Sequence, residues 1–388
     1  MRILFCSQAA YTGGGVETWL ESLSAALASR GWDVVTGLAK GRFHNPDRYA
    51  ARHRVIAPIA IDGSSGFRED RILSLLRLFE GVKPDVILPV NLDDAIAAAA
   101  YWKARGANAH LALCVHGQGE DRIDQVRRYA PFIDLVTSVS KRVANRLGAR
   151  HIPTGVPPPI RDTQPREQLQ RLAYIGRLDS DKRVRDLVPL VRALPGVAFH
   201  VVGGGPDEAY LRKSIAANFH GELSRESLYT SIYPDIDGIL VLSEAETGPI
   251  VAWEAMAHGV VPVTSDYVGR AEENVIRDRE TGLVFPVGDV ERAADVIRNS
   301  GSVRELSIRA RAELPPVYME QAFGDAWDAA LRATIELPPR RGTPSDLPSL
   351  VSPGLIARLG LGIVATSRLR HLLGRSFEHG DSGSEWPH

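Results

Sequence analysis

Short apolar runs alternate with amphipathic stretches over the first 150 residues, a pattern typical of a parallel sheet whose strands are joined by crossover helices. The first run, residues 2–7, predicts a strand. After a glycine triplet, apolar residues from Val16 to Leu27 recur at helical spacing. We therefore expect a helix over residues 16–30, ending before Gly31, which tolerates positive φ. Further strands are predicted within residues 33–38, 85–90, 111–117 and 134–140.

Prolines interrupt this alternation at residues 152–167, where neither a helix nor a central strand can continue. The alternation then restarts, with strands predicted within residues 171–178, 197–205, 238–242, 260–265 and 282–287. The pattern predicts an α/β fold of two doubly wound Rossmann-like domains that face each other across a cleft. We expect the acceptor-side domain at residues 1–160 and the donor domain at residues 161–335. Residues 314–337 either close the second domain or cross back to the first.

The remaining residues, 336–388, are predicted to be a linker and a basic tail. Residues 337–354 are rich in proline and serine, which indicates a flexible connector. Residues 354–375 mix leucines, isoleucines and a valine with four arginines, a composition that suits an interfacial helix at a membrane. The arginines do not gather on one face, so a helix packed on the protein is the alternative. The apolar residues are Leu355, Ile356, Leu359, Ile363, Val364, Leu369, Leu372 and Leu373.

Composition narrows the class of protein. The 388 residues are 44% hydrophobic, and 46 Lys and Arg against 47 Asp and Glu give a net charge of −1, so neither global disorder nor nucleic-acid binding is indicated. Cys6 and Cys114 lie in apolar runs and are expected to be inert core thiols. The first apolar stretch is too short for a signal peptide, and no run approaches the ~18 residues of a spanning helix. We expect a cytoplasmic protein, either free or peripheral at the inner face of the membrane.

Glycines follow the first predicted strand at residues 13–15. Backbone without side chains at Gly14 and Gly15 lets a ligand approach, and the helix N-terminus behind it favours an anion. The spacing is not that of the dinucleotide fingerprint, which counts against a nicotinamide enzyme. A plain tight turn is the alternative.

A second candidate follows the strand that ends at Gly176. Arg177 and Lys182 lie on the next loop, where two cations can neutralise a diphosphate and stabilise the charge that builds on it when it leaves. An ordinary solvated loop is the alternative. Residues 203–205, another glycine triplet after a strand, support a cleft without naming its ligand, and a turn again explains them.

The most informative segment is residues 243–263. Pro249 suits the first position of a helix and Gly259 its C-terminal cap. Glu246 precedes this helix, and Glu254 lies within it, about 7.5 Å farther along the axis than Pro249. Two carboxylates so placed can accept hydrogen bonds from hydroxyls on separate rings of one extended ligand. For Glu254, a partly buried carboxylate with satisfied hydrogen bonds is the alternative.

Taken in order, GGGVET, GRLDSDK, VVGGGP and Glu246-x7-Glu254 resemble the motifs of retaining GT-B glycosyltransferases, above all glycosyltransferase family 4, over roughly residues 1–335. The resemblance implies that Arg177 and Lys182 hold the donor diphosphate. It further implies that Glu254 binds the nucleotide ribose and that Glu246 contacts hydroxyls of the transferred sugar. His116 matches a family histidine beside the reacting sugar, with a core histidine as the alternative. The implied donor site also includes Gly14, Gly15, Gly176, Gly248, Pro249 and Ile250.

The implied activity is transfer of a sugar from a UDP- or GDP-sugar to a hydroxyl of a glycan or lipid-linked acceptor, with retention of configuration. Neither a cofactor nor a metal is expected, since no cluster of His, Cys and Asp has ligand spacing. Surface polysaccharide synthesis of the bacterial type is the expected setting. The alternatives are a nucleotide-sugar epimerase of the same fold and a catalytically silent nucleotide-sugar-binding subunit.

Three departures from the family pattern concern the donor site. The usual Glu-Gly-x-Pro order is Glu246-Thr247-Gly248-Pro249, which leaves the identity of the donor sugar open. Thr154 replaces a common asparagine before the linker glycine. Val268-Gly269-Arg270 replaces a pair of glycines, and the role of Arg270 does not follow from the sequence.

Overall fold

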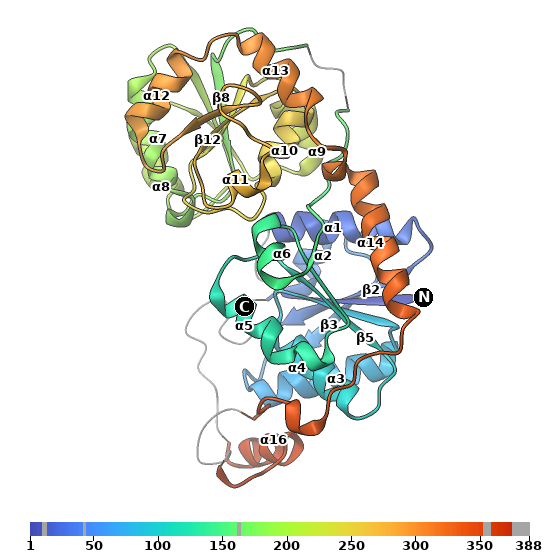
Figure 1. Cartoon of the computed structure of the whole chain (residues 1–388). Coiled ribbons are helices and arrows are strands. Elements are labelled where there is room, and N and C mark those ends of the chain that lie inside the picture. Colours follow the sequence, from blue (N-terminus) through green and yellow to red (C-terminus); the bar gives the residue numbers. More distant parts are fainter. Residues whose placement is uncertain (10–13, 42–43, 161–163, 352–357, 375–388) are drawn as a thin grey trace.

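The computed structural model describes residues 1–9, 14–41, 44–160, 164–351 and 358–374. Gly13 of the first triplet, and Leu355, Ile356 and Arg375 of the tail, lie outside these residues. The described chain forms two lobes, each an open sheet with helices on both faces (Figure 1). This arrangement confirms the predicted α/β fold of two Rossmann-like domains.

The first sheet has seven strands in the order β3-β2-β1-β4-β5-β6-β7, and the second has six in the order β10-β9-β8-β11-β12-β13. Every strand pairing in both sheets is parallel. The strands of the first sheet are β1 (Arg2–Ser7), β2 (Asp33–Lys40), β3 (Pro58–Asp62), β4 (Val86–Val90), β5 (His110–Val115), β6 (Leu135–Ser138) and β7 (Arg150–His151). Those of the second are β8 (Arg171–Ile175), β9 (Ala198–Val202), β10 (Asn218–Gly221), β11 (Gly238–Val241), β12 (Val261–Ser265) and β13 (Leu283–Phe285).

The helices of the first lobe are α1 (Gly15–Ala28), α2 (Pro46–His53), α3 (Arg68–Val82), α4 (Asp93–Ala104), α5 (Glu120–Tyr129) and α6 (Lys141–Leu147). The second lobe carries α7 (Leu187–Ala193), α8 (Glu208–Ser214), α9 (Arg225–Ser227), α10 (Ile250–Ala257), α11 (Arg270–Glu273), α12 (Val290–Arg298) and α13 (Val303–Ala312). The chain ends with α14 (Glu320–Ile335) and α16 (Ile363–Leu372). Shorter turns are η1 (Ala130–Phe132), η2 (Ser180–Lys182), η3 (Val184–Asp186), η4 (Leu228–Ile232), η5 (Pro316–Tyr318) and η6 (Pro344–Asp346).

Central strands are buried on both faces, which explains their continuous apolar sequence. From Ile3 to Ser7, every residue of β1 is buried, and all of β4 and β11 is buried as well. Cys6 is fully buried, and burial raises the pKa of its thiol well above the usual value. Cys114 is partly buried, and its pKa rises to about 12 for the same reason. Both cysteines are free thiols.

Helix α14 crosses back to the first lobe. Trp327 packs edge to face against Trp19 of α1, with ring centroids 5.6 Å apart. Trp32 Nε1 also donates a 2.7 Å hydrogen bond to Asp328. The predicted second domain includes residues up to 335, but this packing places α14 on the first lobe. Of the two alternatives for residues 314–337, the structure therefore shows the one in which they cross back. Elsewhere the predicted domain limits stay predictions.

The segment after α14 lies against the first lobe. The amide of Arg340 donates a 2.6 Å hydrogen bond to Asp134, and Leu350 is buried in the first core. The described part of the predicted connector is therefore held to the first lobe at Arg340 and Leu350, while most of its other residues are exposed. Among the helices that the structure describes, none is both long and apolar enough to span a bilayer.

Candidate active site

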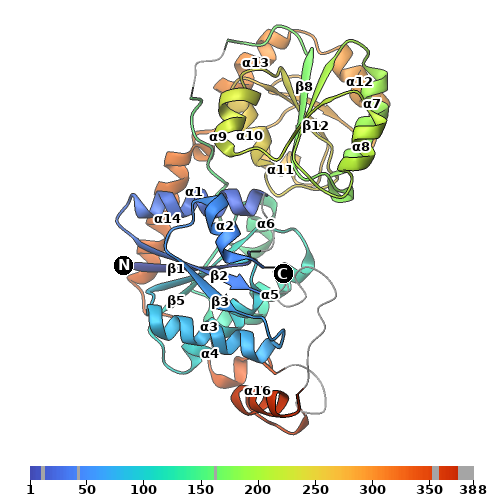
Figure 2. The same ribbon diagram turned by 180° about the vertical axis from the view of Figure 1, so that it is seen from behind.

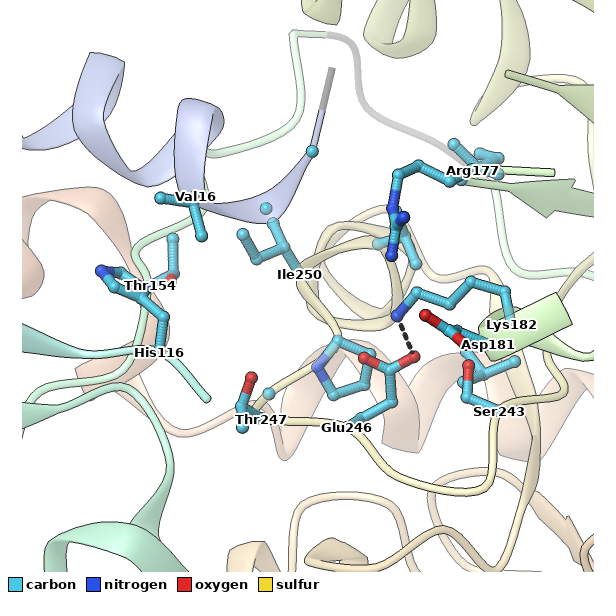
Figure 3. Close-up of a pocket in the computed structure, with 18 of the residues that line it drawn as sticks. Val16, His116, Thr154, Arg177, Asp181, Lys182, Ser243, Glu246, Thr247 and Ile250 are labelled. Carbon is cyan, nitrogen blue, oxygen red and sulfur yellow. Dashed lines mark hydrogen bonds and ion pairs between the residues drawn. The ribbon is translucent and has the colours of Figure 1, made fainter. Parts of the chain in front are cut away.

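A cavity of about 550 Å³ lies between the two lobes, with residues of both in its wall (Figure 3). Several of its residues follow the carboxyl ends of strands: Gln8 after β1, His116 after β5 and Gly176 after β8. This is where open parallel sheets bind ligands. From the first lobe, Gln8, Gly14, Gly15, Val16, Glu17, Asn91, His116, Val139 and Thr154 line the cavity. The second lobe contributes Tyr174, Ile175, Gly176, Arg177, Asp181, Lys182, Leu240, Val241, Leu242, Ser243, Glu246, Thr247, Gly248, Pro249, Ile250 and Val251.

The start of α1 forms one wall. Gly14 is the N-terminal cap residue and has no side chain that could cap α1, while the Glu17 carboxylate lies against this first turn and accepts a hydrogen bond from its own amide. A Cβ atom on Gly14 would lie 2.6 Å from a carboxylate oxygen of Glu17, so a side chain there would displace the end of Glu17. A Cβ atom on Gly15 would lie 3.5 Å from Ile250 of the opposite lobe. The two lobes therefore approach each other closely at this turn.

Arg177 and Lys182 project from the facing wall. Lys182 Nζ lies 2.7 Å from a carboxylate oxygen of Glu246, so two of the predicted residues form an ion pair in the cavity (Figure 3). The Asp179 side chain caps η2 by accepting from the Lys182 amide at 3.2 Å, which fixes the backbone at Lys182. Asp179 also pairs with Arg177 at 2.5 Å. Two cations thus share one wall of the cavity.

The glycines at 203–205 shape this wall from behind. A Cβ atom on Gly203 would lie 1.9 Å from the carbonyl oxygen of Gly176, and one on Gly205 would lie 2.5 Å from that of Leu178. Leu178 N also donates to Gly204 O at 2.9 Å. This triplet packs against the loop that carries Arg177, and its residues do not line the cavity. Its role is to hold that loop.

The turn from Glu246 to Ile250 closes the cavity floor. Gly248 has a φ of 94°, a conformation that glycine adopts readily, so the glycine in third place suits the shape of this turn. Pro249 is the N-terminal cap of α10 rather than its first residue, one position from the prediction. Gly259, with a φ of 66°, follows the end of α10 as expected.

Glu254 lies away from the cavity wall. Its side chain is buried, and Tyr229 Oη donates to Oε1 at 2.6 Å while Tyr233 Oη donates to Oε2 at 2.7 Å. Arg225 Nε also donates to Oε1, at 3.3 Å. In this structure Glu254 is the satisfied buried carboxylate that the sequence left as an alternative, and it is not brought together with Glu246.

His116 lies beside the cavity against Trp19, with ring centroids 4.5 Å apart and an edge-to-face geometry. Burial, and to a lesser degree the positive charge of Arg122, lower the pKa of His116 to about 3. Its Nε2 atom has no hydrogen-bond partner among the described residues. The imidazole is therefore neutral at physiological pH and can offer one donor and one acceptor, but no positive charge.

Several residues of the site went unpredicted, among them Glu17, Asn91 and Gln118. Glu17, in the first turn of α1, is 5% exposed, and burial raises the pKa of its carboxyl although the Arg177 charge opposes this. Asn91 directly follows β4 with a φ of 49°, in the left-handed region. Polar residues directly after a predicted strand or glycine turn are the signal that could have found both.

The third is Gln118, which connects the lobes. Its Nε2 atom donates to the carbonyl oxygen of Glu246 and, at 3.1 Å, to that of Val268. No sequence motif distinguishes this glutamine, because its partners are backbone atoms of the other lobe. Arg270, whose role the sequence left open, pairs with Asp266 at 2.9 Å and donates to Ile276 O at 2.8 Å, so it stabilises its own loop.

More polar contacts join the lobes around the cavity. Arg225, the partner of Glu254, also donates from Nη1 to the Ser22 hydroxyl of α1 at 2.7 Å. On the other side, Glu273 of α11 accepts from the Lys141 amide, at the start of α6, at 3.1 Å. The observed closure of the lobes therefore rests on hydrogen bonds and ion pairs at several points of the rim.

Comparisons with known proteins define the class. The solved structure of Anabaena Alr3699/HepE in complex with UDP-glucose aligns with a TM-score of 0.69 at 16% identity, over 86% of this chain and 100% of that one. Sucrose-phosphate synthase from Thermosynechococcus elongatus aligns with a TM-score of 0.70 at 18% identity, over 87% of this chain and 99% of that one. The fold is that of the GT-B glycosyltransferases.

Sequence comparison supplies the family. The model described as Glycosyltransferase Family 4 matches residues 13–161, and that described as Glycosyl transferases group 1 matches residues 160–307. The chain therefore belongs to the family 4, group 1 glycosyltransferases, as the motifs indicate.

Curated relatives align with only part of the chain. The D-inositol 3-phosphate glycosyltransferase of Mycobacteroides abscessus is 31% identical over 172 residues, which are 41% of this chain and 37% of that protein. The glycogen synthase of Mycobacterium tuberculosis is 29% identical over 152 residues, 36% of each chain. The alignments thus span little more than a third of each relative.

Proposed function

We propose that this protein is a retaining glycosyltransferase that moves a sugar from a nucleoside diphosphate sugar to a hydroxyl of a glycan or a lipid-linked acceptor. One observation carries the proposal: Arg177 and the Lys182–Glu246 ion pair share a cavity with the start of α1, whose cap residue is Gly14. Cations and helix amides that converge on one space suit a diphosphate. A structural neighbour was solved with UDP-glucose, which favours UDP over GDP as the nucleotide.

In this proposal the diphosphate lies between Gly14 and Gly15 on one side and Arg177 and Lys182 on the other. The two cations replace the metal ion that many diphosphate sites use, so no metal is required. Glu246 keeps the Lys182 ammonium in the cavity until the donor arrives and then accepts a hydrogen bond from a sugar hydroxyl. Gly248, Pro249 and Ile250 bring backbone to the same sugar.

The chemical step follows from these positions. The bond between the anomeric carbon and the diphosphate oxygen breaks, and its electron pair moves to that oxygen, where Arg177 and Lys182 stabilise the charge. The acceptor hydroxyl attacks from the same face, and its proton passes to the departing phosphate. The anomeric configuration is retained, and no enzymic base is needed. Neutral His116 lines the same cavity and orients a hydroxyl of the sugar through its ring.

The role of Glu254 as the ribose ligand stays a prediction and carries a structural condition. Both of its oxygens accept hydrogen bonds from tyrosines, and Arg225 binds one of them as well. A ribose that binds Glu254 must therefore displace one of these donors. Arg225 has the longest bond of the three, and its movement would open the carboxylate toward the cavity.

A transfer assay tests the proposal. The protein is incubated with UDP- and GDP-sugars and a panel of hydroxyl acceptors, and the anomeric configuration of any product is read by NMR. Transfer with retention supports the proposal. Absence of both transfer and donor hydrolysis would argue strongly against it. Release of an isomerised sugar would instead identify an epimerase, and donor binding without turnover would identify a silent binding subunit. Surface polysaccharide synthesis is a further prediction, which the acceptor identity would test.

A further inference from the structure

Helix α16 presents polar residues to the protein. Ser367 is buried and donates a hydrogen bond to Asp70 of α3, and His371 Nε2 lies 3.0 Å from the second carboxylate oxygen of Asp70. Arg370 is 3.8 Å from Glu69 and stacks 5.0 Å above the Phe67 ring. The helix is attached mainly by hydrogen bonds and ion pairs, with Ile363 as its one buried large apolar residue among those described.

The outward face of α16 is apolar, the reverse of an ordinary surface helix. Val364 and Leu372, eight residues apart and hence on one side of the helix, are 47% and 84% exposed. Leu359, in the turn before the helix, is 69% exposed, and Leu373, the C-terminal cap residue on another side of the helix, is 55% exposed. We call Val364 and Leu372 the α16 apolar face.

The acidic neighbours of α16, Glu69 and Asp70 of α3, contact its inner side, and the segment that carries the helix has no acidic residue of its own. Residues 347–377 contain no Asp or Glu, while Arg358 and Arg368 are exposed and form no ion pair within the described residues. Arg368 lies between Val364 and Leu372 on the same side of the helix. Exposed leucines around arginines, with no acidic residue, match the chemistry of an anionic lipid surface, which offers apolar chains below negative headgroups.

We propose that the α16 apolar face docks this protein onto an anionic membrane surface. A second copy of the chain is a poorer occupant, because a two-fold contact through this face would bring Arg368 of both copies together in an apolar setting. The helix lies on α3, at the end of the first lobe remote from the second (Figures 1 and 2). Docking there leaves the rim of the cavity away from the lipid. The inference is independent of the proposed chemistry.

Vesicle flotation of the full chain tests this docking. The vesicles contain phosphatidylcholine alone or an equimolar mixture with phosphatidylglycerol. The test variant is Val364→Asn with Leu372→Asn, and the matched control is Ile308→Asn with Leu337→Asn, whose residues are 46% and 66% exposed elsewhere. All four side chains are exposed, so both variants are expected to fold, which circular dichroism verifies.

The wild type and the control are expected to float with anionic vesicles and much less with neutral ones. The test variant should lose about tenfold or more in partitioning. Arg368→Gln should weaken binding only to the anionic vesicles, and added salt should do the same. Absence of binding to either vesicle, or equal binding of test and control variants, overturns the proposal. A wild-type dimer in sedimentation that the test variant alone dissolves would assign the face to self-association instead.

Discussion

The surroundings of Lys182 favour a catalytic role more directly than those of any other residue of the site. Its ammonium lies in a cavity, and its one carboxylate partner in the structure, Glu246, is itself a cavity residue. A purely structural ion pair has no need of a position between two lobes. We therefore place the largest catalytic effect at this residue.

Lys182→Ala is expected to lower the turnover of donor by about 10²-fold or more, because the charge on the leaving phosphate loses a preorganised partner. Steady-state kinetics with the accepted donor measure this. Lys213→Ala, on the exposed face of α8, is the control and should leave turnover unchanged. Equal rates for the two variants would remove Lys182 from the proposed mechanism.

For Glu254, a stability measurement and a binding measurement together distinguish a structural role from a role in nucleotide binding. Glu254→Ala leaves Arg225 and two tyrosine hydroxyls without their acceptor, so the free energy of unfolding should fall by about 3 kcal/mol. Urea unfolding measures this loss, and calorimetry with UDP measures nucleotide binding. Tyr233→Phe is the control, since it removes one hydrogen bond without touching the carboxylate. If UDP affinity falls in Glu254→Ala but not in Tyr233→Phe, Glu254 binds the ribose as predicted. If UDP affinity is unchanged in both variants, the role of Glu254 is structural alone.

His116 should make stability depend on pH. Its pKa is about 3 in the folded protein against an ordinary 6.5, so the unfolded chain binds a proton in this interval while the folded protein does not. Stability should therefore fall as the pH drops below 6.5, by at most about 1.4 kcal/mol per pH unit. Urea unfolding at a series of pH values tests this, with His116→Gln expected to show a shallower slope. Identical slopes would mean that His116 is protonated in the folded protein.

At the residue scale, the sequence predicted several of the residues that line the cavity, and their proposed roles stay predictions. Gly14, Arg177, Lys182 and Glu246 follow strands or glycine turns, and the structure brings them to one cavity. The sequence did not predict a role for Gln118, because its hydrogen bonds go to backbone atoms of a distant segment. Every residue has such atoms, so the residue types in that segment do not indicate the contact. The sequence left the burial of Glu254 as one of two alternatives, because its hydrogen-bond partners Tyr229 and Tyr233 are far from it in sequence.

At the scale of elements, the central strands were predictable, and of the edge strands only β13, whose Leu283 and Phe285 are buried, was predicted. The helix expected over residues 16–30 is α1, Gly15–Ala28, and the runs that predicted β1 and β8 fall on those strands. The missed strands β3, β7 and β10 lie at sheet edges or ends, and β3 has one buried residue, Ile61. A strand with one face exposed lacks the continuous apolar run that indicates a buried strand.

Gln118 of the first lobe holds two loops of the second lobe by hydrogen bonds to their backbone. Gln118→Ala should lower turnover about tenfold, since the Glu246 turn loses the hydrogen bonds that hold it against the first lobe. UDP affinity should change little, because no side chain that faces the diphosphate is altered. Kinetics and calorimetry on the same preparation separate the two. Gln321→Ala, on exposed α14, is the control, and a loss of UDP affinity equal to the loss of turnover would refute a positioning role.

At the scale of the whole molecule, the alternation of apolar runs and the proline-rich stretch foretold two Rossmann-like lobes. The return of α14 to the first lobe was open, because an amphipathic helix does not reveal which of two sheets it covers. The contact between Trp327 and Trp19, which is seen only in the structure, shows that α14 covers the first lobe. The orientation of α16 was unpredictable for the same reason. The sequence does not show that its polar side faces the protein, where it contacts Asp70.

The central claim is that the cavity between the lobes binds a nucleoside diphosphate. Thermal unfolding with UDP, GDP or ADP, on the wild type and on the Arg177→Ala, Lys182→Ala double variant, tests it most directly. We predict that one nucleotide raises the unfolding temperature of the wild type, since ligand at a hundred times its dissociation constant adds ~2.7 kcal/mol of stability. The double variant should lose most of this shift. No shift with any nucleotide, or an equal shift in the double variant, would contradict the account.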